Sequence, residues 1–284
     1  MAERLVDEYD FSFQTRGVAL IVNNQRFEEH DPQLPTRAGS RHDTENLKLI
    51  FQKLGFEDIR IKIDLTAREM TDWLESVAEE DHTYHDCLAC ALLSHGNETF
   101  TRLTDRVSQR HDVISGTDDD ITTNHLIQIF NDANCPTLAG KPRFFIMQAC
   151  RGEQLDDAVE VAVDEVDEVD GMMVEPAYTT TPVPCFKDSI VVCASAPGYA
   201  SVRQPRGGSV FIRNLSDVIL NYDVTQLELQ KLLTRVRQQV AVGFESKSSR
   251  DPSRHMKKQM PCVYSMLTKD VYFRNKSNVT TQCA

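Results

Sequence analysis

Short apolar runs alternate with amphipathic segments along most of the chain. The runs of mainly apolar residues predict buried strands, at residues 17–22, 87–94, 143–147, 189–194 and 261–267. Residues 59–63 alternate apolar and polar side chains instead, which predicts a half-exposed strand. Between these runs, apolar side chains recur at helical spacing, in residues 47–54, 66–80, 124–130, 209–220 and 225–242. This alternation predicts an α/β fold, with a mostly parallel central sheet of about six strands flanked by helices on both faces.

The helix expected from residue 66 carries a start signal of its own. Thr66 and Glu69 have the spacing of a capping box, in which each side chain accepts a hydrogen bond from the other residue's backbone N–H. We therefore expect the helix to begin directly after Thr66.

The alternating pattern stops between Asp156 and about Pro184. Eight acidic residues and no lysine or arginine lie between Asp156 and Asp170, and Gly171 and three prolines follow. Like charges and turn-forming residues predict a mobile, solvated linker. Because the α/β pattern resumes at residue 189, the linker divides one fold instead of separating two unlike domains. Such a linker is expected where a chain is meant to be cut.

Composition narrows the class of protein. The 284 residues suffice for a large core, and 40% of them are hydrophobic, as in globular proteins. A net charge of −12 argues against nucleic acid as a main partner, because phosphate binding favours a basic surface. No apolar stretch approaches the ~20 residues of a membrane span, and the first residues lack the order of a secretory signal. We expect a cytoplasmic protein without nucleic-acid or membrane partners.

The eight cysteines are scattered through expected strands and loops without a paired framework, which favours a reducing compartment. Cys87 and Cys90 have the spacing of half a zinc site. No second half lies nearby, and residues three apart in a strand face opposite sides. We interpret both as core cysteines and expect no metal or other cofactor.

Two reactive side chains follow expected core strands. Cys150 comes shortly after the run at residues 143–147, and His95 directly follows the run at residues 87–94. Because the carboxyl ends of parallel strands meet at one edge of a sheet, the thiol and the imidazole are expected to lie close together. A cysteine nucleophile with a histidine base is an arrangement that peptidases use.

Each residue also has an ordinary interpretation. A histidine in this position is as often a loop or core residue as a base, and a lone cysteine is more often a buried structural thiol. Arginines such as Arg37 and Arg203 are ordinarily solvated surface residues. The catalytic interpretation therefore depends on the joint arrangement.

That arrangement resembles the caspases, most closely the executioner type with a short prodomain. The agreement in order and spacing runs through residues 93–96, 148–152, 195–199, 257–262 and 265–269. Residues 148–152 read Gln-Ala-Cys-Arg-Gly, an established caspase signature that follows its histidine by about 50 residues. The resemblance implies a caspase-like fold split into large and small subunits, and a cysteine endopeptidase that cleaves proteins after aspartate during apoptosis.

The resemblance also implies roles for individual residues. Cys150 would attack the scissile carbonyl, and His95 would transfer protons, with the backbone carbonyl of Pro35 orienting the imidazole. The backbone N–H groups of Gly96 and Cys150 would form the oxyanion hole.

The specificity pocket implied by the resemblance consists of Arg37, Gln148 and Arg203. Paired guanidinium groups bind a carboxylate through charge-assisted bonds that a lysine does not reproduce. Arg203 and Ser201 would also bind the substrate main chain as an added strand.

Some positions depart from the family pattern. Aromatic residues usually stand beside the substrate-binding arginine, but this chain has Ala200, Val202 and Val210 there, and its one tryptophan, Trp73, lies in an expected helix. Smaller walls predict larger pockets beyond the aspartate site and an altered preference there, with aspartate specificity retained. Residues 97–120 are longer than the usual loop after the catalytic histidine.

The acidic linker contains expected processing sites. Residues 167–170 read Asp-Glu-Val-Asp and precede Gly171, a pattern that executioner caspases cut. We expect maturation after Asp170, with Asp167 as an overlapping site; the alternative is a merely solvating linker. The expected division is a tail at residues 1–10, a large subunit at 11–170 with the linker from about 156, and a small subunit at 171–284.

The resemblance implies partners as well: protein substrates with aspartate before the cut bond, a second copy in a dimer of large and small subunit pairs, an upstream initiator caspase, and inhibitor-of-apoptosis proteins. Two alternatives stay open. In the first, the chain is a catalytically weak homologue that regulates an active caspase, either by dimerisation or by competition. In the second, it is a related peptidase that cuts after basic residues. The second is disfavoured because that pocket would need acidic residues where this chain has arginines.

Overall fold

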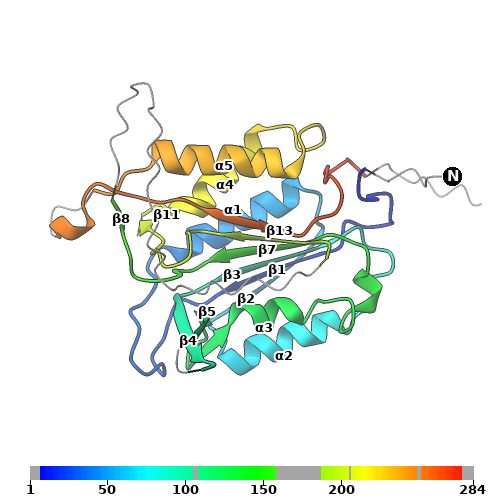
Figure 1. Ribbon diagram of the computed structural model, residues 1–284. Coiled ribbons are helices and arrows are strands. Elements are labelled where there is room, and N and C mark those ends of the chain that lie inside the picture. The colour runs from blue at the N-terminus through cyan, green and yellow to red at the C-terminus, as the bar shows by residue number, and fades with distance from the viewer. Residues whose placement is uncertain (1–6, 105–107, 158–186, 205, 248–250, 277–284) are drawn as a thin grey trace, which may run out of the picture.

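The computed structural model describes residues 7–104, 108–157, 187–204, 206–247 and 251–276. Its centre is a six-stranded sheet in the order β13-β9-β7-β3-β1-β2, seen edge-on in Figure 1. The strands are β1 (Val18–Asn23), β2 (Asp58–Ile63), β3 (Leu88–Leu93), β7 (Arg143–Gln148), β9 (Ser189–Cys193) and β13 (Cys262–Ser265). All neighbours are parallel except β13, which runs antiparallel to β9. The predicted α/β fold with a mostly parallel sheet is confirmed.

Helices cover both faces of this sheet (Figure 1). One face carries α1 (Ser40–Lys53), α4 (Val210–Asn221) and α5 (Leu229–Gly243). The opposite face carries α2 (Ala67–Ala78) and α3 (Thr123–Gln128). Short 3-10 helices lie at Pro136–Leu138 and Pro252–Arg254. Two hydrophobic layers therefore enclose the sheet.

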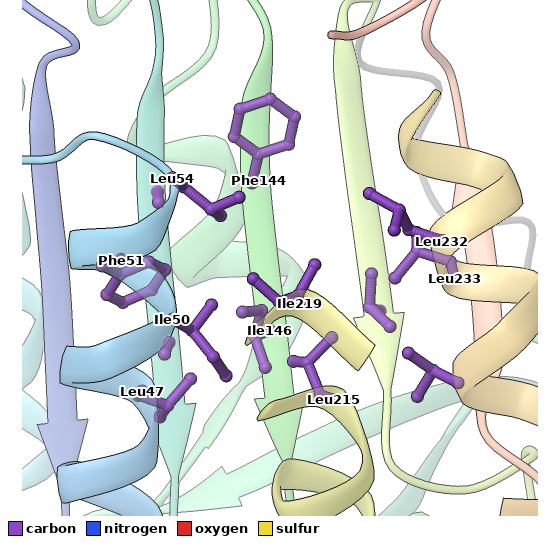
Figure 2. Packing of buried hydrophobic residues seen from close by; sticks show 14 of the residues in the cluster. Leu47, Ile50, Phe51, Leu54, Phe144, Ile146, Leu215, Ile219, Leu232 and Leu233 are labelled. Carbon is purple, nitrogen blue, oxygen red and sulfur yellow. The ribbon is translucent and has the colours of Figure 1, made fainter. Parts of the chain in front are cut away.

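The larger layer packs side chains of α1, α4 and α5 against the central strands. Figure 2 shows the residues that meet there: Leu47, Ile50, Phe51, Leu54, Phe144, Ile146, Leu215, Ile219, Leu232 and Leu233. Those that lie in helices, together with Leu54 at the C-cap of α1, recur at the helical spacing that predicted those helices, and Phe144 and Ile146 come from β7. A rigid layer of this kind fixes the ends of the strands that carry the candidate site.

Cys87 and Cys90 are buried on opposite sides of the sheet. Cys87 belongs to the layer under α1, α4 and α5, and Cys90 belongs to the layer under α2 and α3. Two thiols on opposite faces cannot share a metal ion, so the interpretation as core cysteines agrees with the structure.

The side chains that cap α2 and α5 determine the residues at which these helices begin. Thr66 and Glu69 form the expected capping box at the start of α2. The helix expected from residue 225 begins later, at Leu229, because the Glu228 side chain accepts hydrogen bonds from the backbone of Gln230 and Lys231. That carboxylate caps the first turn, and residues 225–227 remain outside the helix.

Residues 97–120 do not form the loop that the sequence predicted. They contribute to a three-stranded antiparallel sheet of β4 (Gly96–Arg102), β5 (Ser108–Ser115) and β6 (Asp120–Thr122). The prediction was wrong because β4 is exposed along most of its length, so its composition is that of a polar loop. Burial begins only at the end of β5, where Val113 and Ile114 enter the core.

The start of the acidic segment is also ordered. Asp156 and Asp157 form β8, which pairs antiparallel with β12 (Lys257–Lys258). The predicted linker therefore begins later than Asp156, because its first two acids lie opposite two lysines. Most of the linker, including Asp167 and Asp170, lies outside the described residues.

The described part of the expected N-terminal tail, residues 7–10, packs against the rest of the fold. Tyr9 is 6% exposed, and its backbone N–H donates to the carbonyl of Asp270 over 3.0 Å. Among the described residues, no helix is both long enough and apolar enough to cross a membrane.

Candidate active site

Cys150 and His95 follow two neighbouring strands. β3 and β7 are parallel and in register, with Leu93 opposite Gln148, so the residues after them leave the sheet at the same edge. Both line one cleft with a volume of about 740 Å³. Its walls also include Pro35, Gly96, Ser201 and Arg203, together with Ser246, Arg254 and Lys257.

The His95 ring is held in one orientation. Its Nε2 lies 2.7 Å from the carbonyl oxygen of Pro35. Because a carbonyl only accepts, Nε2 carries the hydrogen in this contact, and in the neutral ring Nδ1 is left with a free lone pair. Phe27 packs edge-on against the ring, with centroids 4.8 Å apart. Burial lowers the pKa of His95, and the charges of Arg37 and Arg203 lower it further, although the bond to Pro35 opposes this. The site therefore favours a neutral imidazole.

Cys150 is the described cysteine that lines this cleft, and it is partly exposed. Its sulfur accepts a hydrogen bond of 3.3 Å from the backbone N–H of Ser201 and lies 3.6 Å from that residue's hydroxyl oxygen. Cys90 and Cys193, by contrast, are fully buried, and burial raises the pKa of each to about 12. Those two thiols are inert, whereas Cys150 is accessible to a substrate.

Gly96 makes the close approach between β4 and the Cys150 loop possible. A Cβ atom at this position would lie 2.6 Å from the carbonyl oxygen of Val113 and 2.9 Å from the Cβ of Ala149. Any other residue would push the loops apart. The glycine therefore keeps the His95 and Cys150 segments close enough to share one cleft.

Arg37 lies behind the cleft and is fully buried. Its Nη1 donates to the side chain of Asn23 over 2.9 Å and to the carbonyl of Asn24 over 2.6 Å. Its Nε and Nη2 have no hydrogen-bond partner among the described residues. Burial lowers the pKa of this guanidinium to about 9, and the charge of Arg203 contributes. Buried donors without acceptors are costly, so this site is short of an acceptor.

Gln148 and Arg203 complete the surroundings. The Gln148 Nε2 donates to the Ser201 hydroxyl over 3.1 Å, while its Oε1 has no partner among the residues the structure describes. Arg203 begins β10 (Arg203–Gln204), which pairs with β11 (Gly208–Ser209). Its Nε donates to the carbonyl of Ala38 over 3.2 Å, and its side chain lines the cleft. Of the three predicted pocket residues, Arg203 lines the cleft with Cys150, and Gln148 contacts its wall through Ser201. Arg37 is not among the lining residues.

Comparison with known proteins decides the family. The model of the caspase domain matches residues 16–272. Caspase-7 of Gallus gallus is 37% identical over 94% of this chain and 80% of its own length, and caspase-3 of Bos taurus is 35% identical over 95% and 88%. The crystal structure of caspase-1 from Spodoptera frugiperda superimposes with a TM-score of 0.78 at 31% identity, covering 98% of this chain and 97% of that one. The chain belongs to the caspase family.

Family membership makes this caspase a cysteine-type endopeptidase related to the executioner caspases, with the apoptotic role of that group. Aspartate specificity is typical of the family, and membership also implies protein substrates and dimerisation. The residues that would carry these properties in this chain are a separate question.

The positions that lack aromatic residues fall into two groups in this caspase. Ala200 and Val202 line the cleft, and their role as walls of a substrate pocket stays a prediction. Val210 does not: it is the first residue of α4, fully buried in the hydrophobic layer, and its N–H donates to the carbonyl of Val202 over 3.0 Å. The prediction that Val210 contacts substrate is corrected, because its side chain completes the core.

Sequence reasoning missed the residues that position this site. Gln259 is 2% exposed; its Oε1 accepts from the backbone of Val202 over 2.9 Å, and its Nε2 donates to the carbonyl of Ala194 over 2.8 Å. Asn23 similarly supports Arg37. Both are polar residues in or beside apolar runs, which is the one signal the sequence carries for such roles.

Proposed function

We propose that this caspase hydrolyses proteins after aspartate, with Cys150 as nucleophile and His95 as base and acid. One observation carries the aspartate assignment: Arg37 is fully buried beside the cleft, yet two of its nitrogens have no acceptor among the described residues. A short carboxylate side chain entering from the cleft would satisfy both. No cofactor is needed for this reaction.

In the proposed reaction, the sulfur of Cys150 loses its proton to Nδ1 of His95 and attacks the scissile carbonyl carbon. The carbonyl oxygen becomes negative and accepts hydrogen bonds from the backbone N–H groups of Gly96 and Cys150, where each donor contributes roughly 3–4 kcal/mol. His95 then donates the proton to the leaving amine, and the carbon–nitrogen bond breaks. Water, deprotonated by His95, hydrolyses the acyl-enzyme and restores the thiol. Pro35 keeps the ring aligned throughout.

The proposed grip on the substrate carboxylate uses three groups. Arg37 offers Nε and Nη2, and Arg203 lies at the mouth of the same pocket. Gln148 contributes a third donor if its amide turns over, which exchanges the unpartnered oxygen for Nε2–H. The Ser201 hydroxyl can then donate to the amide oxygen. Ser201 and Arg203 would bind the substrate main chain.

We further propose activation by cutting after Asp170, with Asp167 as the overlapping site. These residues lie outside the described part of the chain, and the proposal is supported by the sequence of residues 167–170. The cut would separate the large subunit at residues 11–170 from the small subunit at 171–284. An initiator caspase would make it in the cytoplasm, and inhibitor-of-apoptosis proteins would oppose the dimeric product.

Turnover of matched peptides tests the proposal. The purified chain should release a fluorophore from Asp-Glu-Val-Asp amides, while Cys150→Ala should not. Replacing the final aspartate by asparagine should lower kcat/KM by several orders of magnitude, because a pocket built for a carboxylate rejects what leaves its donors unpaired. Glutamate should also be cut more slowly, because its longer side chain places the carboxylate differently. Equal cleavage of the three peptides would refute the pocket assignment. Normal two-chain enzyme from the double variant Asp167→Ala, Asp170→Ala would refute the processing site.

The alternative of a catalytically weak homologue has one supporting feature, the small residues Ala200 and Val202 in the cleft wall. Under that alternative the wild-type chain would turn over the aspartate peptide little faster than Cys150→Ala in the same assay.

A further inference from the structure

Asp43 is a fully buried carboxylate behind the pocket, and it takes no part in the proposed chemistry. It lies in the first turn of α1, which starts after the loop that carries Arg37. Its Oδ1 accepts from the backbone N–H of Ser209 over 2.6 Å and from the Ser209 hydroxyl over 3.0 Å. Its Oδ2 has no partner among the described residues. A buried charge that is only half satisfied needs a physical explanation.

The first part of the explanation is position. Ser209 lies opposite Arg203 in the short β10–β11 pair, so Asp43 fastens the strand that faces Arg203 to α1. Gly208 permits this contact: its φ is +74°, and a Cβ there would lie 2.5 Å from Oδ1 of Asp43. The segment that carries Arg203 is therefore built around this carboxylate.

The second part is charge. Burial lowers the pKa of Arg37, and the charge of Arg203 lowers it further, while Asp43 acts in the opposite direction. Burial also lowers the pKa of Arg203, and Asp43 is the largest influence that opposes it. Asp43 thus lies within electrostatic reach of two like charges that repel each other in a poorly solvated pocket.

We propose that Asp43 is a positioning residue of the aspartate pocket: its negative charge holds Arg37 and Arg203 together before substrate arrives, so that both face one carboxylate. This deepens the proposed function and rests on it. With Asp43 neutral, repulsion would drive the more mobile guanidinium away. Arg203 is the one that moves, because Arg37 is fixed by Asn23 and Asn24 whereas Arg203 is partly exposed.

The substitution Asp43→Asn separates charge from shape. Its amide oxygen still accepts from Ser209, while the charge is gone. The full-length protein would be given two peptides in one digest, ending in aspartate or asparagine before the cut bond. The ratio of the two products reports selectivity independently of how much enzyme is folded. We expect Asp43→Asn to lower the preference for aspartate at least about tenfold, as loss of one member of a buried charge set implies.

Two further variants make the result specific. Asp188→Asn makes the same change at another buried carboxylate, outside the cleft, whose Oδ2 also has no hydrogen-bond partner among the described residues, and should leave the ratio unchanged. Ser209→Ala removes the hydroxyl contact with Asp43, and with it the N-cap bond from the Ile212 N–H, but keeps the charge. It should change the ratio less than about threefold. KM for the aspartate peptide should rise in Asp43→Asn while kcat stays nearly constant.

An unchanged or higher preference for aspartate in Asp43→Asn would overturn the inference. A loss in Ser209→Ala as large as in Asp43→Asn would also overturn it, because Asp43 would then act as an anchor alone. The proposed function fails separately, namely if the wild-type protein does not cut the aspartate peptide or if Cys150→Ala still does.

Discussion

At the scale of single residues, His95 shows how burial sets a working protonation state. Its pKa is lowered by burial, with the charges of Arg37 and Arg203 acting in the same direction. Phe27 packs edge-on against the ring and contributes to its burial. We predict that the His95 resonance in a proton NMR titration moves at a pH below the ordinary histidine value of about 6.5. In Phe27→Ala it should move back toward that value.

The same shift has a consequence for stability. The unfolded chain protonates His95 at a higher pH than the folded protein does. The folded state therefore loses stability as pH falls from about 6.5 through the lowered pKa, and this group has no effect above that window. In His95→Gln this part of the acid sensitivity should disappear. An unchanged pH dependence of the melting temperature in His95→Gln would contradict the prediction.

At the scale of elements, the β4–β5 pair holds the loop that carries the nucleophile. Asp112 of β5 accepts from Nε and Nη2 of Arg151 over 3.0 and 2.6 Å, and Arg110 donates to the carbonyl of Arg151 over 3.0 Å. The Arg151 guanidinium also stacks over Tyr264 of β13, at 5.0 Å. Removing the charge of Asp112 would leave the buried guanidinium of Arg151, the residue directly after Cys150, without its carboxylate partner. We predict that Asp112→Asn destabilises the protein by about 3–5 kcal/mol and lowers kcat.

Urea unfolding and turnover measure both effects. The matched control is Asp72→Asn, which breaks the exposed Arg68–Asp72 pair of α2 and should cost about 0–1 kcal/mol without a change in kcat. If Asp112→Asn behaves like Asp72→Asn, the β4–β5 pair has no role in holding the Cys150 loop.

The contacts of the β4–β5 pair could not be predicted from the sequence. The strands of the central sheet are buried on both faces or alternate in polarity, so short windows of sequence were enough to predict them. Asp112 and Arg151 are far apart in the chain, and nothing in either local pattern indicates that they meet. In the same way, the motif around Cys150 predicted the nucleophile, whereas the supporting roles of Asp43 and Gln259 depend on contacts made only in the fold.

At the scale of the whole molecule, the N-terminal segment ties together parts of the chain that activation would separate. The Tyr9 hydroxyl donates to Asp188 over 2.6 Å and accepts from the backbone of Thr268 over 3.0 Å. A cut after Asp170 would leave Tyr9 in the tail that precedes the large subunit, and both of its partners on the small subunit. A chain that starts at residue 11 would lack Tyr9 altogether, whereas a chain that starts at residue 7 would keep it.

Tyr9→Phe tests this connection because it keeps the ring and removes the hydroxyl. Asp188 is 2% exposed, so the loss leaves a buried acceptor short of a donor, and we predict a destabilisation of about 1–3 kcal/mol. Tyr84→Phe is the control: its side chain is 62% exposed, and the change should stay within about 0.5 kcal/mol. In the two-chain form, the urea concentration that dissociates the subunits should fall for Tyr9→Phe and for a chain that starts at residue 11. A chain starting at residue 7 keeps Tyr9 and the 2.7 Å bond from the Asp270 N–H to the Asp7 carbonyl, so it should match the full-length protein. Equal dissociation of all four would show that Tyr9 does not join the subunits.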